Sequence, residues 1–375
     1  MPGCKITNNY KPCEPRKKAE TEMVYLYQPE KEWTYSHHPS ITCFKGRFYA
    51  IWSNGRQNED DLGQRVLISA SEDFYHWTEP VPLVPSTWGQ HSELVLTAAG
   101  FHQYGDTLTA YFGQYEYEPD MIQNGVRKHG DQGHRGTCLK YITTCDGVSW
   151  SLPQDTGLPI VPNHGPQKTG TGRLIISGNI MYPYTDDPAG HTGWKQTGIY
   201  NKEWNKSICD DSESFRKINQ WMGRSMEMLC EGSFYQTVDG NLHMLLRSNT
   251  DRLWVSESSD NGETWSEPDK TDFTDNSTKF HFGLMPDGRY YYVGSPDPEP
   301  GGARNPLVLS ISEDGSTFDS HYVLRDEPYI QIAPGLYKSG TYGYPHTMIQ
   351  DNVLYVIYSL KKEGIAALRV KLDEL

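Results

Sequence analysis

A short turn motif that combines a small residue, an aspartate and a closing aromatic recurs four times along this chain. The full version, SSDNGETW, spans residues 258–265, and versions one residue shorter occupy residues 71–77, 144–150 and 312–318. Each copy follows an apolar stretch. Ser and Asp side chains accept hydrogen bonds from backbone N–H groups in such turns, Gly tolerates a positive φ, and the aromatic ring packs beneath. We interpret the motif as a structural hairpin turn, and its repetition predicts a fold built from similar β-sheets.

A second unit, two strands joined by a short turn, lies between these motifs. It starts six times, about 60 residues apart. The six copies span His38–Ser53, His91–Gly113, Gly170–Thr185, Cys230–Ser248, Thr278–Ser295 and Tyr344–Ser359. The 35 Gly, 24 Pro and 25 Tyr suit short strands and tight turns, and no window keeps helical periodicity. We predict an all-β, single-domain β-propeller with six blades, or seven if the poorly marked segment 190–220 holds another.

The sixth unit has no outer strand of its own. Residues 23–28, MVYLYQ, have the character of a strand and would complete that sheet, which would remove an unpaired edge. We therefore expect residues 1–22 to be an N-terminal extension and residues 23–375 to be a propeller closed by an N-terminal strand.

Charge and hydropathy restrict the partners. The net charge of −14 and the isoelectric point near 5.4 argue against nucleic acid or an anionic membrane as a partner. Neither a signal-peptide core nor a long apolar run is visible, so we expect a cytoplasmic protein, or a secreted one if a signal has been removed. Seven scattered cysteines indicate free thiols. We expect no required cofactor; the Asp pair in residues 184–187 leaves a structural calcium ion open, although a turn explains it as well.

Polar and ionisable residues recur where the first strand of each unit begins. In a propeller these strand ends converge on one face, which is where a ligand would meet several side chains at once. The residues at these positions are Tyr35, His37, His38, His91, Glu93, Arg173, Glu231, His281, Tyr344 and His346.

Four segments carry a family resemblance. Residues 230–248 place an Arg 16 residues after a Glu, residues 301–315 place an Arg before an Asp-containing turn, residues 343–359 carry a Tyr, and residues 54–69 hold an acidic loop. Together with the repeated turns, they resemble the sialidase superfamily of β-propellers over essentially the whole chain. The resemblance implies a base, a nucleophile, two carboxylate-binding arginines and an acid, which would be Glu231, Tyr344, Arg247, Arg304 and either Asp60 or Asp61, of which we favour Asp61.

The chain departs from that family at residues 36–39. The stretch reads Ser-His-His-Pro, where the family carries the first arginine of its triad. An imidazole does not replace a permanently charged planar guanidinium without loss. This departure makes sialidase activity the second hypothesis rather than the first.

The overall character of the sequence is more similar to propeller lyases and hydrolases that act on L-rhamnose-α-1,4-D-glucuronate than to sialidases. Our first hypothesis is therefore a lyase that cleaves beside a uronic acid by β-elimination on an acidic, arabinogalactan-like glycan. Elimination needs a group that neutralises the carboxylate, a base and an acid. We assign His91 as the base, Tyr344 or His38 as the proton donor, and as substrate contacts Arg247, Arg304, Arg173, His37 and His346. The alternatives are an exo-α-sialidase-like retaining hydrolase and a propeller that binds glycan without cleaving it.

Overall fold

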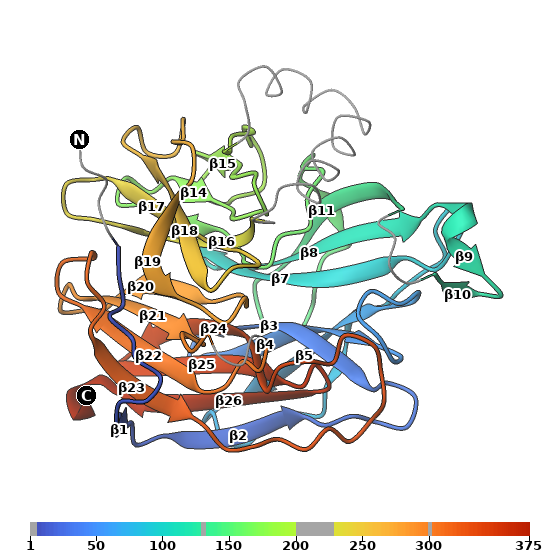
Figure 1. The fold of residues 1–375 in the computed structure, drawn as a ribbon. Helices are drawn as coiled ribbons and strands as arrows, with labels where there is room; N and C mark the ends of the chain where they lie inside the picture. Colours follow the sequence, from blue (N-terminus) through green and yellow to red (C-terminus); the bar gives the residue numbers. More distant parts are fainter. Residues whose placement is uncertain (1–5, 129–132, 200–228, 299–301) are drawn as a thin grey trace.

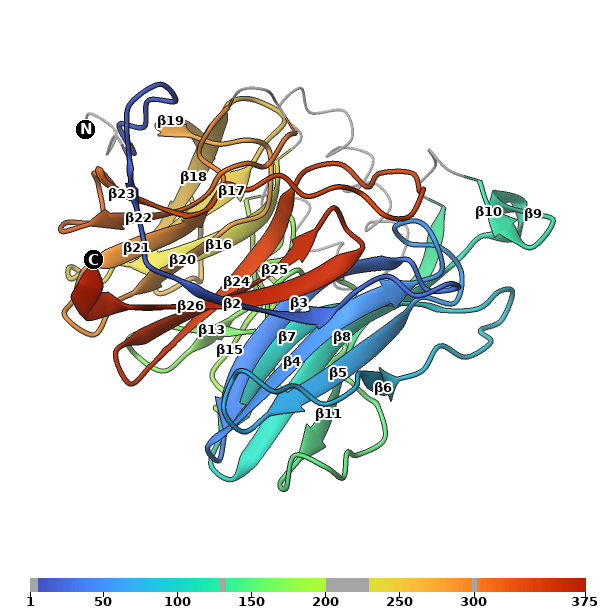
Figure 2. The same ribbon diagram turned by 90° about the horizontal axis from the view of Figure 1, so that it is seen from below.

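The computed structural model describes residues 6–128, 133–199, 229–298 and 302–375. The described chain is built almost entirely from β-strands, with two short 3-10 helices, η1 (Pro119–Met121) and η2 (Leu372–Glu374). Figures 1 and 2 show the sheets following one another around the molecule in chain order. The all-β prediction is confirmed.

The first two sheets are antiparallel and four-stranded. One contains β3 (Tyr35–Phe44), β4 (Arg47–Gly55), β5 (Arg65–Ser71) and β6 (Val81–Val84). The next contains β7 (Val95–Tyr104), β8 (Thr107–Tyr117), β11 (His134–Thr144) and β12 (Gln154–Asp155). A small hairpin of β9 (Ile122–Gln123) and β10 (Val126–Arg127) projects from the second sheet.

Two further sheets follow. The smaller one contains β13 (Gln167–Lys168), β14 (Leu174–Ile175) and β15 (Tyr184–Thr185). The other contains β16 (Cys230–Gln236), β17 (Leu242–Arg247), β18 (Arg252–Ser258) and β19 (Asp269–Thr274). The strands of the smaller sheet are two residues long, and Gly178 and Pro183 lie in the segment that joins β14 to β15.

Strands from the N-terminal segment join the last two sheets. One sheet contains β20 (His281–Leu284), β21 (Tyr290–Gly294), β22 (Leu307–Ser312), β23 (Ser320–Arg325) and the parallel strand β1 (Lys17–Lys18). The other contains β24 (Tyr342–Gln350), β25 (Val353–Leu360), β26 (Gly364–Lys371) and β2 (Glu22–Tyr27). Strand β2 runs antiparallel to β26, with Met23 opposite Leu368.

Part of the expected N-terminal extension is packed against the sheets. Ile6 is fully buried in a cluster with Phe273 and Phe318, and the Asn8 amide donates a hydrogen bond of 3.0 Å to the Thr274 hydroxyl. The division at residue 22 stays a prediction. So does the number of blades: six sheets beside the β9–β10 hairpin are found in the described ranges, and most of the segment that could hold a seventh blade lies outside them.

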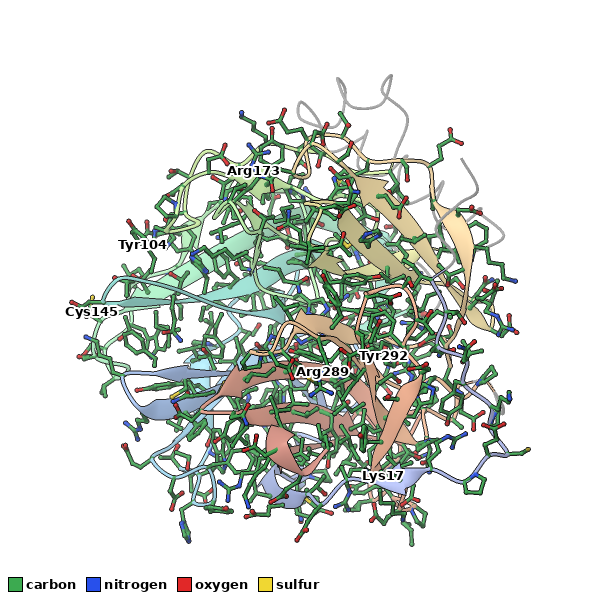
Figure 3. All side chains as sticks on the ribbon, turned by 90° about the vertical axis from the view of Figure 1, so that its left-hand side faces the viewer. Lys17, Tyr104, Cys145, Arg173, Arg289 and Tyr292 are labelled. Atoms are coloured by element: carbon green, nitrogen blue, oxygen red, sulfur yellow. The ribbon has the colours of Figure 1, made fainter. Side chains whose placement is uncertain are left out.

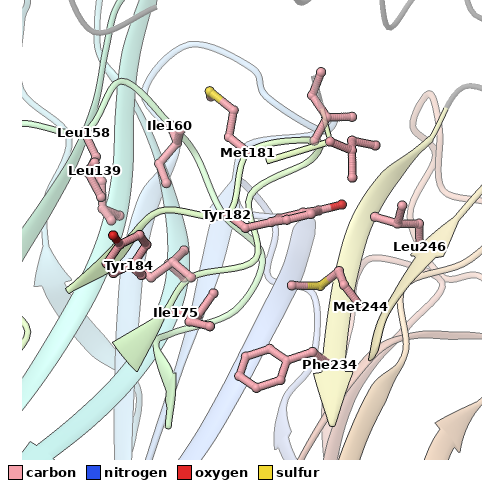
Figure 4. Close-up of a cluster of buried hydrophobic side chains, with 14 of the residues drawn as sticks. Leu139, Leu158, Ile160, Ile175, Met181, Tyr182, Tyr184, Phe234, Met244 and Leu246 are labelled. Atoms are coloured by element: carbon pink, nitrogen blue, oxygen red, sulfur yellow. The ribbon is translucent and has the colours of Figure 1, made fainter. Parts of the chain in front are cut away.

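The hydrophobic core lies between neighbouring sheets. In one cluster, Ile175 from the three-stranded sheet and Tyr182, just before β15, pack towards Phe234, Met244 and Leu246 of the next sheet (Figure 4). Successive side chains of a strand point to opposite faces of its sheet, and strands such as β4 and β22 are buried along almost their whole length, so one sheet buries both faces against its two neighbours. The inner strands are thereby fixed side by side: β24 lies against β3, β3 against β7, and β16 against β20.

The repeated motif forms the predicted turn. In the full version, the Asp260 carboxylate accepts hydrogen bonds from the Thr264 backbone N–H (2.9 Å) and the Ser258 hydroxyl (2.8 Å), and Gly262 has a φ of +88°. The Trp265 ring packs edge-on against Tyr182 with a centroid distance of 5.0 Å. The motif is therefore a structural feature, as predicted.

Asp260→Ala is expected to lower the free energy of unfolding by about 1–2 kcal/mol, because the turn loses a charged acceptor shared by several donors. Chemical denaturation with far-ultraviolet circular dichroism measures the change. Asp106→Ala is the control, since that side chain is 92% exposed and pairs only with surface Lys45, so a change within about 0.5 kcal/mol is expected. Equal stabilities of the two variants would contradict the structural role.

Two other sequence predictions concern cysteines and membranes. The described cysteines are free thiols: Cys13, Cys43, Cys138, Cys145 and Cys230. Within the described ranges, no helix has the length and apolar character needed to cross a lipid bilayer.

Candidate functional site

Local backbone irregularities bring four predicted site residues into unusual conformations. His38, Glu231, Arg304 and Tyr344 all have φ between 44° and 54°, a region that residues other than Gly seldom adopt. The pairing register shifts in β3, β16 and β24 where three of them lie, so each is the extra residue of a β-bulge. Bulges of this kind re-aim side chains, and such strain concentrates at functional sites.

Tyr344, Glu231 and Arg247 form one hydrogen-bonded group. The Tyr344 hydroxyl donates to Glu231 Oε1, Arg247 Nη1 lies 2.6 Å from Glu231 Oε2, and the same Nη1 donates to the Tyr344 oxygen at 3.2 Å. The tyrosine and the glutamate are buried. The structure therefore brings together three residues that the family resemblance assigned to one site.

The electrostatics of this group keep Glu231 ionised and Tyr344 protonated at rest. Burial favours the neutral carboxyl, but the Arg247 charge and the bonds from Tyr344 and Arg247 lower the pKa of Glu231. Burial and the Glu231 charge raise the pKa of Tyr344 well above its usual value, against the opposing charge of Arg247. The carboxylate is therefore positioned as the acceptor of the phenol proton.

Arg304 is a buried cation whose donors are incompletely used. Its guanidinium carbon lies 5.6 Å from the centre of the Tyr344 ring. The side chain is 5% exposed, and Nε and Nη1 have no hydrogen-bond partner among the described residues. Burying unpaired donors is costly, so this arrangement is typical of a site whose acceptor arrives with a ligand.

His37 and His38 occupy the position where the family carries an arginine. The His37 ring lies 3.9 Å from the Tyr344 ring, centroid to centroid, and its Nδ1 is 2.7 Å from the Ser359 hydroxyl. Burial, followed by the His38 charge, holds the pKa of His37 well below its usual value, and burial lowers the pKa of His38 to about 4. Both rings are neutral at pH 7, so they do not supply the missing positive charge.

The acidic loop separates into three carboxylates with different surroundings. Burial opposes ionisation of Glu59, but Lys362, whose Nζ lies 2.5 Å from Oε2, lowers its pKa to about 2. Burial and the neighbouring Glu59 charge raise the pKa of Asp60 to about 6. Asp61 instead accepts hydrogen bonds of 2.9 Å from both the backbone and the side-chain nitrogen of Asn58, which fixes the loop. These surroundings favour Asp60 over Asp61, our first choice, as the acid.

Three other predicted residues lie outside this group. His91 is exposed, and its backbone N–H bonds to Glu116; it lies in a loop because β7 begins only at Val95. Arg173 is labelled in Figure 3 and pairs with Asp186 at 2.7 Å and Glu263 at 3.2 Å across neighbouring sheets. Arg173 immediately precedes β14, and these two pairs engage its guanidinium in a contact between sheets. The structure places both residues outside the Tyr344 group, so the assignments of His91 as a base and Arg173 as a substrate contact gain no support from it and stay predictions.

His346 also has a different environment from the one predicted. It does not contact the Tyr344 group among the described interactions but stacks on His281, with ring centroids 4.8 Å apart. The His164 ring completes this cluster. A substrate-binding role beside Tyr344 is therefore not supported.

Two groups have the residue types of a metal site: His37, His38 and Glu59, and the cluster of His164, His281 and His346. In the first, Glu59 is already paired with Lys362, which opposes metal binding. In the segment considered for calcium, Asp186 pairs with Arg173 and Asp187 accepts N–H groups of its own turn. Calcium at that segment stays a prediction, although these contacts favour the turn.

The sequence interpretation missed several residues of the site. Lys362 and Glu59 pair beside His38, and the Asn163 amide donates to Glu231 at 3.3 Å. Lys279 is fully buried, and its Nζ lies 5.7 Å from the centre of the Tyr344 ring. Glu59 had a visible signal, because three acids follow one another in a single loop. The two lysines had none, since an isolated lysine in a sequence normally indicates a solvated surface.

Comparison with models of known protein families shows the family of the chain. A model of the BNR repeat-like domain matches residues 46–356, which is most of the chain. The chain belongs to the BNR repeat-like family. The resemblance to the sialidase superfamily is confirmed, because solved sialidases share this BNR fold.

Among solved structures, one described as a sialidase matches with a TM-score of 0.62 at 18% identity over 95% of this chain and 33% of its own. Trypanosoma rangeli sialidase in complex with sialic acid has a TM-score of 0.62 at 13% identity, over 96% of this chain and 60% of its own. A protein of unknown function from Dyadobacter fermentans has a TM-score of 0.63 at 17% identity, over 93% of this chain and 98% of its own. The BNR chain thus spans a third to three fifths of the sialidases, and these likenesses show the propeller fold alone. No curated protein matches.

Proposed function

We propose that this protein is a retaining glycoside hydrolase that releases an anionic sugar, with Tyr344 as nucleophile and Glu231 as its base. The observation that carries the proposal is the direct hydrogen bond between a buried phenol and a buried carboxylate that Arg247 keeps ionised. One structure of Trypanosoma rangeli sialidase, with a TM-score of 0.64 at 13% identity, is described as a covalent intermediate. That chemistry supports the proposal by analogy.

The reaction follows two displacements. In the first, the Tyr344 oxygen attacks the anomeric carbon while Glu231 takes the phenol proton, and the glycosidic bond breaks as Asp60 protonates the departing oxygen. In the second, Asp60, now ionised, removes a proton from water, the water oxygen attacks the same carbon, and Tyr344 leaves and regains its proton from Glu231. Inversion occurs twice, so the configuration of the sugar is retained.

The two neighbouring carboxylates divide the acid–base work. Glu59 is held ionised by Lys362, so it is unsuited to donate a proton, whereas Asp60 has a raised pKa. A pair of carboxyl groups with pKa values pushed apart is the usual arrangement for acid catalysis near neutral pH. The Tyr115 hydroxyl also bonds to the Asp60 carboxyl and orients it.

The anionic group of the sugar would bind Arg304. Its unpaired donors and its position beside Tyr344 favour a carboxylate next to the scissile bond. Two classes of substrate fit: sialosides, and sugars carrying a uronic acid. Because His37 and His38 are neutral, the site offers less positive charge to the sugar carboxylate than the three arginines of a sialidase would. This favours a substrate whose carboxylate needs fewer cationic contacts.

The lyase hypothesis is retained as the second candidate because of those two histidines. With His91 removed from the site, Tyr344 deprotonated by Glu231 would be the base that removes the proton beside the uronate carboxylate. Incubation with a sialoside and with a rhamnosyl-glucuronate oligosaccharide, followed by mass spectrometry, separates the two. Hydrolysis yields a product carrying one added water, and elimination yields an unsaturated uronate without it. Activity on neither class would contradict both candidates.

The pH dependence should report Asp60. Its pKa is raised to about 6, so the acid form required for the first step is present below that pH and lost above it. We expect kcat/KM to fall tenfold per unit of pH above about 6, and Asp60→Asn to abolish this limb with a loss of about 100- to 10,000-fold. A substrate with p-nitrophenol as leaving group should recover most of the rate, since it needs little protonation. Asp61→Asn is the control, and an unchanged limb in Asp60→Asn would contradict the assignment.

A further inference from the structure

Three imidazole rings meet where the inner strands approach one another. His281 begins β20, His346 lies in β24, and His164 lies in the segment before β13, so the three rings come from distant parts of the chain. One ring nitrogen of each lies within 4.8 Å of those of the other two. The His281 ring stacks on His346 at 16° and on His164 at 27°, with centroids 4.8 and 5.1 Å apart. The proposed reaction uses none of them.

Hydrogen bonds determine which nitrogen carries the proton in two of the rings. His281 Nδ1 accepts the Thr347 backbone N–H at 3.0 Å and lies 2.6 Å from the Thr347 hydroxyl. His346 Nδ1 accepts the Ile41 backbone N–H at 3.4 Å. A neutral imidazole that accepts at Nδ1 carries its proton on Nε2. Both rings therefore offer an N–H donor, not a lone pair, from their other nitrogen.

The rings themselves bring no charge. Burial lowers the pKa of His281 to about 3, and burial also holds the pKa of His164 and His346 well below the usual value. The Lys279 charge adds to the fall in all three, so this lysine lies within electrostatic reach of the whole cluster. Burial lowers the pKa of Lys279 as well, to about 7, so its ammonium supplies the positive charge at this place while it stays protonated, which a bound anion favours.

Among the described residues, Lys279 lacks a hydrogen-bond partner, and His164 has none beyond the backbone of Phe280. The lysine is fully buried and its Nζ makes no hydrogen bond among the described residues. His164 is 1% exposed, and neither of its ring nitrogens makes a hydrogen bond of good geometry there. Buried polar groups are ordinarily satisfied, and a buried ammonium needs a counter-charge. An acceptor with negative charge would satisfy the lysine and the N–H groups together.

We propose that Lys279, the Nε2–H groups of His281 and His346, and His164 form a binding site for a small inorganic anion of halide size. A divalent metal fits this donor set less well. It would need a lone pair from each ring at about 2.0–2.1 Å, whereas two rings present protons, and it would lie near an ammonium. A halide needs only N–H donors and a positive charge, and it accepts longer contacts. The three rings take no part in the proposed reaction, but Lys279 lies beside the reaction site, with its Nζ 5.7 Å from the centre of the Tyr344 ring.

Bromide is the probe. Crystals of the full chain soaked in sodium bromide and measured at the bromine absorption edge are expected to show an anomalous peak in contact with Lys279 Nζ and the rings of His281 and His346. Lys279→Met should remove this peak while surface bromides remain. Lys45→Met, which changes an exposed lysine, should retain it.

Measurements in solution test the same proposal if a variant does not crystallise. At constant ionic strength, replacing gluconate by bromide should raise the Tm of the unaltered protein, and Lys279→Met or Lys279→Gln should weaken the apparent bromide affinity by at least about 10-fold. Absence of the peak in the unaltered protein would overturn the proposal. So would one equivalent of zinc, found by elemental analysis, that is lost in His346→Ala.

Discussion

Tyr344→Phe is expected to lower kcat/KM at least about 1,000-fold, because the variant lacks the oxygen that attacks the anomeric carbon. Little rearrangement should follow, since the phenyl ring keeps its packing against His37. Glu231→Gln should cause a loss of similar size, because the phenol then has no base. The rates are measured with the substrate that the product analysis identifies.

The control for this variant lies in the same strand. Tyr342→Phe removes a hydroxyl that bonds to the Glu327 carbonyl at 2.6 Å, and we expect activity within about threefold of the unaltered protein. The double variant of Tyr344 and Glu231 should be no worse than either single one, since the two act as a unit. Additive losses, or substantial turnover by Tyr344→Phe, would contradict the nucleophile assignment.

Arg304→Met is expected to lower kcat/KM about 100- to 1,000-fold. The variant removes the charge and the planar donors that would bind the sugar carboxylate, while the Met side chain fills part of the same buried volume. This loss corresponds to about 3–4 kcal/mol of binding free energy, which is typical when one partner of a buried charge pair is removed. Binding of the product sugar, followed by calorimetry, should weaken by a similar factor.

The control for Arg304 is another arginine outside the site. Arg173→Met removes the pairs with Asp186 and Glu263 and should reduce stability without reducing the rate of the folded protein. The reverse result, with Arg173 needed for binding and Arg304 dispensable, would restore our first assignment of Arg173 and contradict the site described above.

Much of the fold could be predicted from local chemistry. The Asp260 turn is specified by residues within four positions of Asp260, so it is visible in the sequence. The alternating apolar strands are also local signals. The three-stranded sheet was predicted less well, because strands of two residues each leave little alternation to recognise in the sequence.

Site residues that belong to a known family pattern were predicted from the sequence. Residues that are buried only through contacts with distant parts of the chain were missed. Glu231, Arg247 and Tyr344 belong to three strands, and a known family pattern links them. His91 was misplaced because a strand was expected to start there, whereas β7 starts at Val95. Lys279 could not be recognised, since its burial results from sheets far apart in the chain.

The most direct test of the central claim is the covalent intermediate. The protein is incubated with 2,3-difluorosialic acid, the compound in the Trypanosoma rangeli structure described above, and with the corresponding fluorinated glycosyl fluoride of any uronic acid that it releases. Peptide mass spectrometry should then find one sugar attached to the peptide that contains Tyr344, and none in Tyr344→Phe. Turnover with retention of configuration but without this adduct, or an adduct on another residue, would contradict the account.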